Sequence, residues 1–167
     1  MSRPSLTIDR LLRAAEEVRG NAYAPYSGFQ VGAAVLAGGR VYAACNVENS
    51  SFPLCVCAER NAVALAVSAG ARRIEGVAVV GGSGRPSAPC GGCRQVLAEF
   101  AAPDTPVVYA TPSGERIATT VGALLPAAFG PEDLKEAPAG SRGSPEARAP
   151  GKRRSAARGR ASRTSGR

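Results

Sequence analysis

Three cysteines have a spacing that could form a metal site, and a glutamate lies beside one of them in the sequence. Cys90 and Cys93 make a C-x-x-C pair directly after Pro89. If a helix begins at Cys90, residues three apart share a face, so both sulfurs can reach one ion. Cys57 and Glu59 open a second apolar helical pattern, and Cys57 can add a third thiolate if it lies at the helix cap. The chain contains no histidine, and zinc tolerates a shell made of thiolates alone.

The coordination number and the neighbouring charges indicate catalysis. Three sulfur ligands leave one tetrahedral position free, which is typical of a catalytic zinc site. Glu59 is then the candidate proton shuttle, since a carboxylate at the helix mouth can act first as a base and then as an acid. Thiolates give the site a negative charge, so we expect Arg60 to hydrogen-bond one or two ligand sulfurs. Arg94 and the two helix N-termini are further positive partners.

Two other interpretations of the cysteines stay open at this point. A lone C-x-x-C pair also occurs as a redox disulfide. If Cys55 joined the cluster, a fourth sulfur would close it into a structural zinc site, and a nucleic-acid-binding module would be the alternative to an enzyme. Against that module, residues 1–130 are nearly balanced in charge and show no basic stripe with stacking aromatics. For Cys45 and Cys55 we expect packed free thiols.

The elements that must position this site follow from the spacing of apolar residues. Helical spacing begins at Ile8, with Ser5 or Thr7 as the cap, and apolar runs bounded by turn residues indicate strands. The expected helices cover 8–18, 58–69, 89–102 and 119–129, and the expected strands cover 30–37, 40–48, 73–82, 105–110 and 115–119. This alternation predicts an α/β fold with three layers, α/β/α, around a central mixed five-stranded sheet.

Composition divides the chain into a folded part and a basic tail. We expect one catalytic domain over residues 1–136 and a disordered tail over 137–167, because the tail is rich in Pro, Gly, Ser and Arg, and residues 131–167 hold most of the net charge of +8. The basic composition of the tail allows weak contact with nucleic acid, and we expect this contact to have no function. No apolar run approaches the ~20 residues that a membrane helix needs. Because the N-terminus also lacks the apolar core of a signal peptide, we expect a cytoplasmic location and no membrane partner.

Four short motifs carry a resemblance to a known family. CAER at 57–60, followed by PCGGCRQ at 89–95, is similar to the zinc motif of the nucleoside deaminases. Upstream, YAPYSGFQVGAAVL and CNVENSSFPLC resemble the small homotetrameric cytidine deaminases, and the likeness covers roughly residues 5–134. The resemblance implies a cytidine deaminase-like fold, a homotetramer with sites near the subunit contacts, and one zinc ion per subunit. It also implies hydrolysis of cytidine and 2′-deoxycytidine to uridine and 2′-deoxyuridine, with release of ammonia, in pyrimidine salvage.

The resemblance assigns the chemistry to individual residues. Cys57, Cys90 and Cys93 match the zinc ligands, and Glu59 matches the proton shuttle. Glu59 would carry one proton from water to N3 of cytosine and a second proton to the departing amino group. An antibiotic, guanine or RNA-editing deaminase is the alternative within the same superfamily.

The substrate contacts that the resemblance implies lie on both sides of the zinc motif. Asn46 and Glu48 match the pair that holds the ribose hydroxyls, and this agrees with their chemistry, because Asn donates and accepts whereas Glu accepts. A polynucleotide has no free 3′ hydroxyl except at its end, so this pair favours a single nucleoside as the substrate over an internal RNA base.

Four further positions complete the implied substrate site. Phe29 matches an aromatic residue that packs near the nucleoside, and Ala58 matches a residue that touches the base through its backbone. Phe52 stands where many relatives have Tyr, so a hydroxyl contact from that position is absent here. Phe129 matches an aromatic residue that reaches the pocket of a neighbouring subunit.

Overall fold

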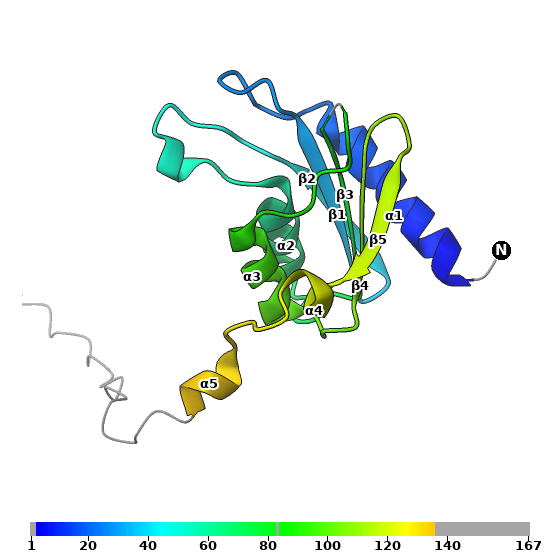
Figure 1. Cartoon of the computed structure of the whole chain (residues 1–167), viewed down its shortest axis with the longest axis vertical. Coiled ribbons are helices and arrows are strands. Elements are labelled where there is room, and N and C mark those ends of the chain that lie inside the picture. The colour runs from blue at the N-terminus through cyan, green and yellow to red at the C-terminus, as the bar shows by residue number, and fades with distance from the viewer. Residues whose placement is uncertain (1–2, 83, 136–167) are drawn as a thin grey trace, which may run out of the picture. The chain divides into compact units, whose positions relative to one another are not determined.

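The computed structural model describes residues 3–82 and 84–135 (Figure 1). The compact unit spans Met1–Lys135. The expected disordered tail at 137–167, with its weak contact to nucleic acid, lies outside the described residues. In the part of the chain that is described, no helix is long and apolar enough to span a bilayer.

A mixed sheet forms the centre of this unit. Its five strands, in the order β2-β1-β3-β4-β5, are β1 (Val31–Ala37), β2 (Arg40–Cys45), β3 (Gly76–Gly81), β4 (Pro106–Ala110) and β5 (Arg116–Thr120). Strands β3 and β4 are parallel, and the other neighbours are antiparallel. The tight turn between β1 and β2 consists of Gly38 and Gly39, both with positive φ, as a two-residue hairpin requires. The expected hairpin and mixed sheet are therefore confirmed.

Helices cover both faces of the sheet, as the sequence predicts. Helix α1 (Arg3–Arg19) packs on one face, where Leu11 and Ala15 meet Ala34 of β1. Helices α2 (Ala58–Ser68) and α3 (Gly91–Phe100) lie on the other face, and Figure 1 shows this arrangement. Their core contacts include Val35, the next residue of β1, because successive strand residues point to opposite faces. The three layers of the expected α/β fold are confirmed.

The approach of α1 to the sheet depends on one glycine. A Cβ atom on Gly32 of β1 would lie 1.9 Å from the carbonyl oxygen of Ala15 and 2.9 Å from the backbone nitrogen of Arg19. No side chain fits there, so the helix backbone rests directly on the strand.

The sheet topology brings the starts of α2 and α3 together. Helix α3 connects the parallel strands β3 and β4, so its first residues follow the carboxyl end of β3. Ligand sites in open α/β sheets lie at this edge, outside the carboxyl ends of parallel strands. Helix α2 packs beside α3, and its start faces the same edge.

Some boundaries differ from the sequence prediction. Helix α1 begins at Arg3, upstream of both expected caps, so Ser5 and Thr7 lie inside it. The expected C-terminal helix is shorter: α4 (Val121–Leu124) is one turn, capped by the Thr120 hydroxyl, which accepts from the backbone N–H of Ala123 at 3.2 Å. Two short elements were not expected, the 3-10 turn η1 (Phe52–Leu54) and helix α5 (Pro131–Lys135).

Candidate metal centre and adjoining pocket

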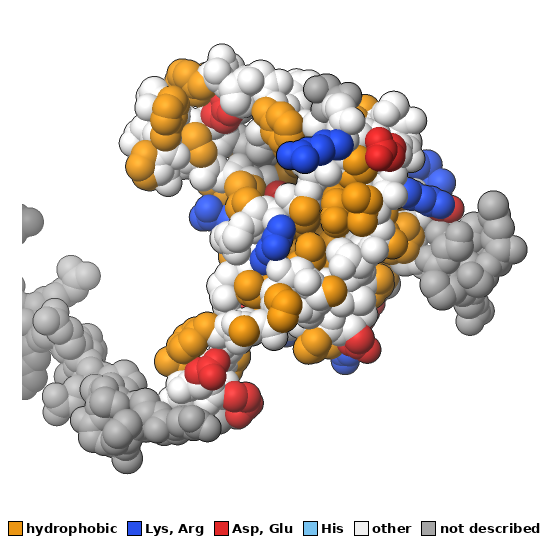
Figure 2. All heavy atoms as spheres, viewed as in Figure 1, with side chains coloured by type: hydrophobic (Ala, Val, Ile, Leu, Met, Phe, Trp, Pro, Cys, Tyr) orange, Lys and Arg blue, Asp and Glu red, His pale blue; other side chains and the backbone are white. Residues whose placement is uncertain are grey.

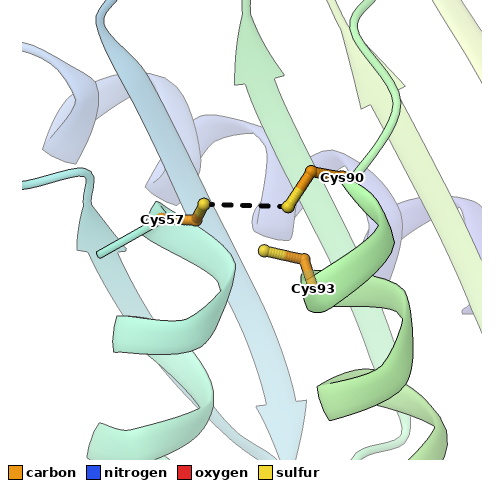
Figure 3. Close-up of side chains that lie close together, drawn as sticks. All are labelled: Cys57, Cys90 and Cys93. Carbon is orange, nitrogen blue, oxygen red and sulfur yellow. Dashed lines mark hydrogen bonds between the residues drawn. The ribbon is translucent and has the colours of Figure 1, made fainter. Parts of the chain in front are cut away.

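The structure gathers the three expected sulfur ligands. The Sγ atoms of Cys57, Cys90 and Cys93 all lie within 4.8 Å of one another. Figure 3 shows their side chains pointing toward a common centre from the starts of α2 and α3. The Sγ atoms of Cys57 and Cys90 are 3.8 Å apart. Zinc–sulfur bonds of about 2.3 Å in tetrahedral geometry place two sulfurs about 3.8 Å apart, so the donor set fits zinc.

Helix caps orient two of these sulfurs. Cys57 is the N-cap of α2 and Cys90 is the N-cap of α3, both with extended backbone angles. Neither side chain bonds its own helix, so both sulfurs are directed toward each other. Cys93 lies one turn further along α3 and is fully buried. The first-turn amides of both helices favour negative charge at this point, which suits thiolate ligands.

The thiols are electrostatically coupled. Hydrogen bonding from Cys93, and also from Cys90, together with the charge of Arg60, lowers the pKa of Cys57 to about 6 despite its partial burial. The hydrogen bond to Cys57, together with burial, raises the pKa of Cys93 well above its usual range. The thiolate of Cys57 is thus stabilised by its neighbours, and ionising Cys93 beside it requires a positive charge near both sulfurs. A divalent metal ion supplies that charge.

Glu59 lies beside the sulfur cluster. It is the second residue of α2, and only 6 % of its surface is exposed. Burial raises the pKa of its carboxyl group, and the negative charge of Cys57 adds to that effect. A carboxyl group with a raised pKa exchanges protons closer to neutral pH than an exposed glutamate does. The environment of Glu59 therefore suits a proton carrier.

The two arginines near the cluster behave differently from each other. Arg60 is exposed, and its charge is among the causes that lower the pKa of Cys57. Its hydrogen bond to a ligand sulfur stays a prediction. Arg94, expected as a further positive partner, instead donates from Nε to the carbonyl of Pro89 at 2.8 Å and from Nη1 to the carbonyl of Leu124 at 3.0 Å. Its guanidinium ties the loop before Cys90 to α4.

The two remaining cysteines lie outside the sulfur cluster. The Sγ atom of Cys55 accepts from the backbone N–H of Asn49 at 3.3 Å and donates to the carbonyl of Asn49 at 3.6 Å. Cys45 ends β2, and its thiol is only partly exposed. Among the described residues the metal cluster comprises three sulfurs, so the geometry does not support the closed four-sulfur alternative.

A cavity of about 190 Å³ adjoins the metal cluster. Cys57, Cys90 and Glu59 line it, as do Phe29, Asn46 and Ala58, three of the expected substrate contacts. Ser87 and Ala88, from the loop before Pro89, complete part of the wall. Sequence reasoning missed Ser87 and Ala88, although their position just before the C-x-x-C pair was a usable signal.

The other expected substrate contacts lie elsewhere. Glu48 and Phe52 line a second pocket with Tyr26, Ser27 and Cys55, and the rings of Phe52 and Tyr26 meet edge to face at 5.8 Å. Phe129 follows α4 and is 60 % exposed; its carbonyl accepts from Nε2 of Gln95 at 2.7 Å.

Asn46 and Glu48 hold the loop that carries Phe29. Asn46 Nδ2 donates to the carbonyl of Phe29 at 2.9 Å, and its Oδ1 accepts from the backbone N–H of Val31 at 2.9 Å. Glu48 accepts from the backbone N–H groups of Tyr26 and Ser27 at 2.9 and 3.2 Å, and from the Ser27 hydroxyl. The hydroxyl of Ser27, and next the N–H of Tyr26, lower the pKa of Glu48. Sequence reasoning did not identify Ser27.

The fold and the site together indicate which class of zinc protein this is. Three thiolates at two helix starts, open on one side toward a buried carboxyl group and a cavity, form a catalytic type of zinc site. A closed structural site would have a fourth protein ligand in that position.

Comparison with known proteins identifies the family. Residues 6–111 match the family described as "Cytidine and deoxycytidylate deaminase zinc-binding region". A cytidine deaminase from Sporosarcina psychrophila is 45% identical over 133 residues, which cover 79% of this chain and 98% of that protein. One from Halalkalibacterium halodurans is 46% identical over 127 residues, covering 75% and 96% of the two chains.

Solved structures agree with this assignment. The crystal structure of cytidine deaminase from Burkholderia pseudomallei matches with a TM-score of 0.70 at 45% identity, over 77% of this chain and 100% of that one. The Mycobacterium tuberculosis cytidine deaminase structure matches with a TM-score of 0.63 at 41% identity, over 73% and 96%. The chain therefore belongs to the cytidine and deoxycytidylate deaminase family, and zinc is its cofactor.

Proposed function

We propose that this protein is a cytidine deaminase that hydrolyses cytidine and 2′-deoxycytidine to uridine and 2′-deoxyuridine with release of ammonia, a reaction of pyrimidine salvage. The observation that carries the proposal is the position of Glu59, a buried carboxyl group lining the same cavity as the sulfurs of Cys57 and Cys90. The relatives named above, which are cytidine deaminases, support the same substrate class.

Glu59 moves the protons of the reaction. Cys57, Cys90 and Cys93 would hold a zinc ion, which would lower the pKa of a bound water and so supply a hydroxide nucleophile near neutral pH. Glu59 takes up the proton that the water loses and delivers it to N3 of cytosine, which makes C4 electrophilic. After the hydroxide adds to C4, Glu59 takes the proton of the new C4 hydroxyl and passes it to the amino group, so the C4–N bond breaks as the C4 carbonyl forms. One water molecule is consumed, and uridine and ammonia leave.

The walls of the cavity suit a pyrimidine nucleoside. Phe29 offers an aromatic face for packing, and Ala58 brings its backbone to the cavity because its side chain is small and turned into the core. Asn46 lies on the wall of the cavity, and Glu48 lies in the next pocket along the same loop. Together Asn46 and Glu48 would hold the sugar hydroxyls.

A homotetramer is part of the proposal, with Phe129 reaching the pocket of a neighbouring subunit. Several large apolar side chains are exposed in the single chain, among them Phe52 at 68 %, Leu54 at 64 % and Phe129 at 60 %. Figure 2 shows hydrophobic side chains on the projecting segment between β2 and α2, at the upper left. Exposed apolar surface of this kind is typical of subunit contacts. A cytoplasmic location and one catalytic domain over 1–136 likewise remain proposals.

The test is ammonia release by the zinc-loaded full-length protein. We expect turnover with cytidine and 2′-deoxycytidine, and none with free cytosine, guanine or blasticidin S. Turnover of any of the last three compounds would indicate a different deaminase. Glu59→Gln should keep one zinc per chain and lose nearly all turnover. Glu75→Gln, the same change at an exposed carboxylate at the other end of β3, is the matched control and should keep both. Full turnover by Glu59→Gln would overturn the proposed mechanism.

A further inference from the structure

The carboxylate of Glu48 is held entirely from one short loop. Its Oε2 atom accepts from the backbone N–H of Tyr26 at 2.9 Å and from that of Ser27 at 3.2 Å. Its Oε1 atom accepts from the Ser27 hydroxyl. Oε2 is thus used twice and Oε1 once, so Oε1 keeps a lone pair for a further donor.

The hydroxyl of Ser27 has no donor left for a ligand. It gives its single proton to Glu48, and it accepts from the backbone N–H of Phe29 at 3.0 Å. Ser27 and Glu48 both line a pocket that opens to solvent. Toward that pocket the pair presents oxygen lone pairs and no proton, so a group that donates a hydrogen bond fits there and an acceptor-only or anionic group does not.

Apart from the bond between the Ser27 hydroxyl and the N–H of Phe29, the loop is held by backbone bonds that do not involve this hydroxyl. Backbone hydrogen bonds join the loop to the segment that follows β2. The N–H of Tyr23 donates to the carbonyl of Asn46 at 3.1 Å, and the N–H of Glu48 donates to the carbonyl of Tyr23 at 2.8 Å. The N–H of Gly28 donates to Ala24 at 3.0 Å and closes the turn. Removal of the Ser27 hydroxyl therefore leaves Oε1 of Glu48 without its donor and the N–H of Phe29 without its acceptor, while Oε2 keeps its two backbone donors and the backbone bonds of the loop remain.

We propose that Ser27 is a positioning residue that fixes the Glu48 carboxylate to accept a hydrogen bond from one sugar hydroxyl of the substrate, and so makes the site select nucleosides whose hydroxyl at that position is free. This inference rests on the proposed function. The Ser27 hydroxyl confines Glu48 to one orientation before the substrate arrives, so less side-chain freedom is lost on binding. It acts on sugar binding and is remote from proton transfer by Glu59, so its effect falls on KM and leaves kcat unchanged.

The experiment compares Ser27→Ala, Ser27→Thr and Ser113→Ala in the zinc-loaded full-length protein. Ser113 is the matched control, since its hydroxyl bonds Thr111 at 2.9 Å in the turn between β4 and β5. The substrates are cytidine, 2′-deoxycytidine and 3′-deoxycytidine. For Ser27→Ala with cytidine we expect KM to rise about tenfold, while kcat stays within about twofold of the value for the unsubstituted protein. A rise in KM of about tenfold corresponds to the loss of one hydrogen bond to a charged group. Ser27→Thr should restore KM, and Ser113→Ala should change nothing.

The deoxynucleosides identify the hydroxyl and separate positioning from structure. With the substrate that lacks the hydroxyl bound by Glu48, Ser27→Ala and the unsubstituted protein should have equal KM values. The inference is overturned if Ser27→Ala fails to fold, if kcat falls as much as KM rises, or if KM rises equally with all three substrates. Turnover of cytidine with an unchanged KM in Ser27→Ala would overturn this inference alone. No turnover by the unsubstituted protein would overturn the proposed function, and this inference with it.

Discussion

The Sγ atoms of Cys57 and Cys90 lie 3.8 Å apart, although 33 positions separate the two residues in the sequence. Each residue caps a different helix, and the two helices meet at the edge of the sheet (Figure 3). An ion bound between these sulfurs therefore joins α2 to α3 as well as serving the reaction. Metal binding and folding stability are coupled at such a site, because the ligands are assembled only in the folded chain.

Loss of one sulfur should consequently remove both metal and stability. For Cys90→Ala we expect zinc content to fall from one per chain to near zero, with a lower melting temperature and less folded protein, since zinc contributes on the order of 10 kcal/mol to folding in structural thiolate sites. Metal analysis and thermal denaturation measure the two effects. Cys55→Ala is the control, because Cys55 bonds the backbone of Asn49 outside the cluster. Zinc loss from Cys55→Ala would mean that Cys55 is a ligand.

The contact between α1 and β1 predicts a purely structural effect. Gly32→Ala would bring its Cβ to 1.9 Å from the carbonyl oxygen of Ala15, so helix and strand must separate. Overpacking of this severity costs about 3 kcal/mol, measured as a lower free energy of unfolding in urea. Gly20→Ala, at the end of the same helix, has only an ordinary contact at 3.7 Å from the carbonyl oxygen of Glu17 and should change stability little. Equal stability of the two variants would contradict this packing.

Short-range rules predicted that each sulfur ligand lies at a helix start, whereas grouping Cys57 with Cys90, 33 positions away, rested on the chemistry of the site and on the resemblance. A C-x-x-C pair at a helix start places two sulfurs on one face, and the structure has Cys90 and Cys93 there. Cys57 was expected at a helix cap, and it is the N-cap of α2. The strands were found for the same reason, since alternation and apolar runs are local properties of the chain.

Side-chain partners far apart in sequence could not be predicted in this way. Arg94 was expected to compensate the sulfur charge, and it bonds the carbonyl of Leu124 instead, a choice that depends on where α4 lies after folding. Ser27 and Glu48 are 21 positions apart, and only the folded course of their two segments brings them together. Spacing rules act within one element, whereas these contacts join separate ones.

The ionisation of Glu48 predicts how KM depends on pH. The hydroxyl of Ser27 and the N–H of Tyr26 lower the pKa of Glu48 from its ordinary value of 4.5. The ionised carboxylate is the form that accepts a sugar hydroxyl, so KM should stay low above that pKa and rise as the pH falls through it. In Ser27→Ala the main stabilising bond is gone, so the pKa moves up and the rise in KM begins at higher pH. Measuring KM with cytidine from about pH 4 to about pH 7 checks this order, and a rise at lower pH in Ser27→Ala would contradict it.

The bonds of Arg94 predict an indirect effect on the metal. Arg94→Ala leaves the carbonyls of Pro89 and Leu124 without their charged donor, and Pro89 is fully buried, so we expect a loss of about 1–3 kcal/mol in the free energy of unfolding. Because Pro89 directly precedes Cys90, the loop that positions the Sγ atom of Cys90 should also become less rigid. Zinc should then be lost at a lower chelator concentration than in the unsubstituted protein. Arg72→Ala is the control, since Arg72 also donates to two carbonyls, those of Val67 and Ala71, but on an exposed helix end. Competition with a chromogenic chelator measures zinc retention, and equal retention in the two variants would show that Arg94 supports α4 without positioning the metal ligand.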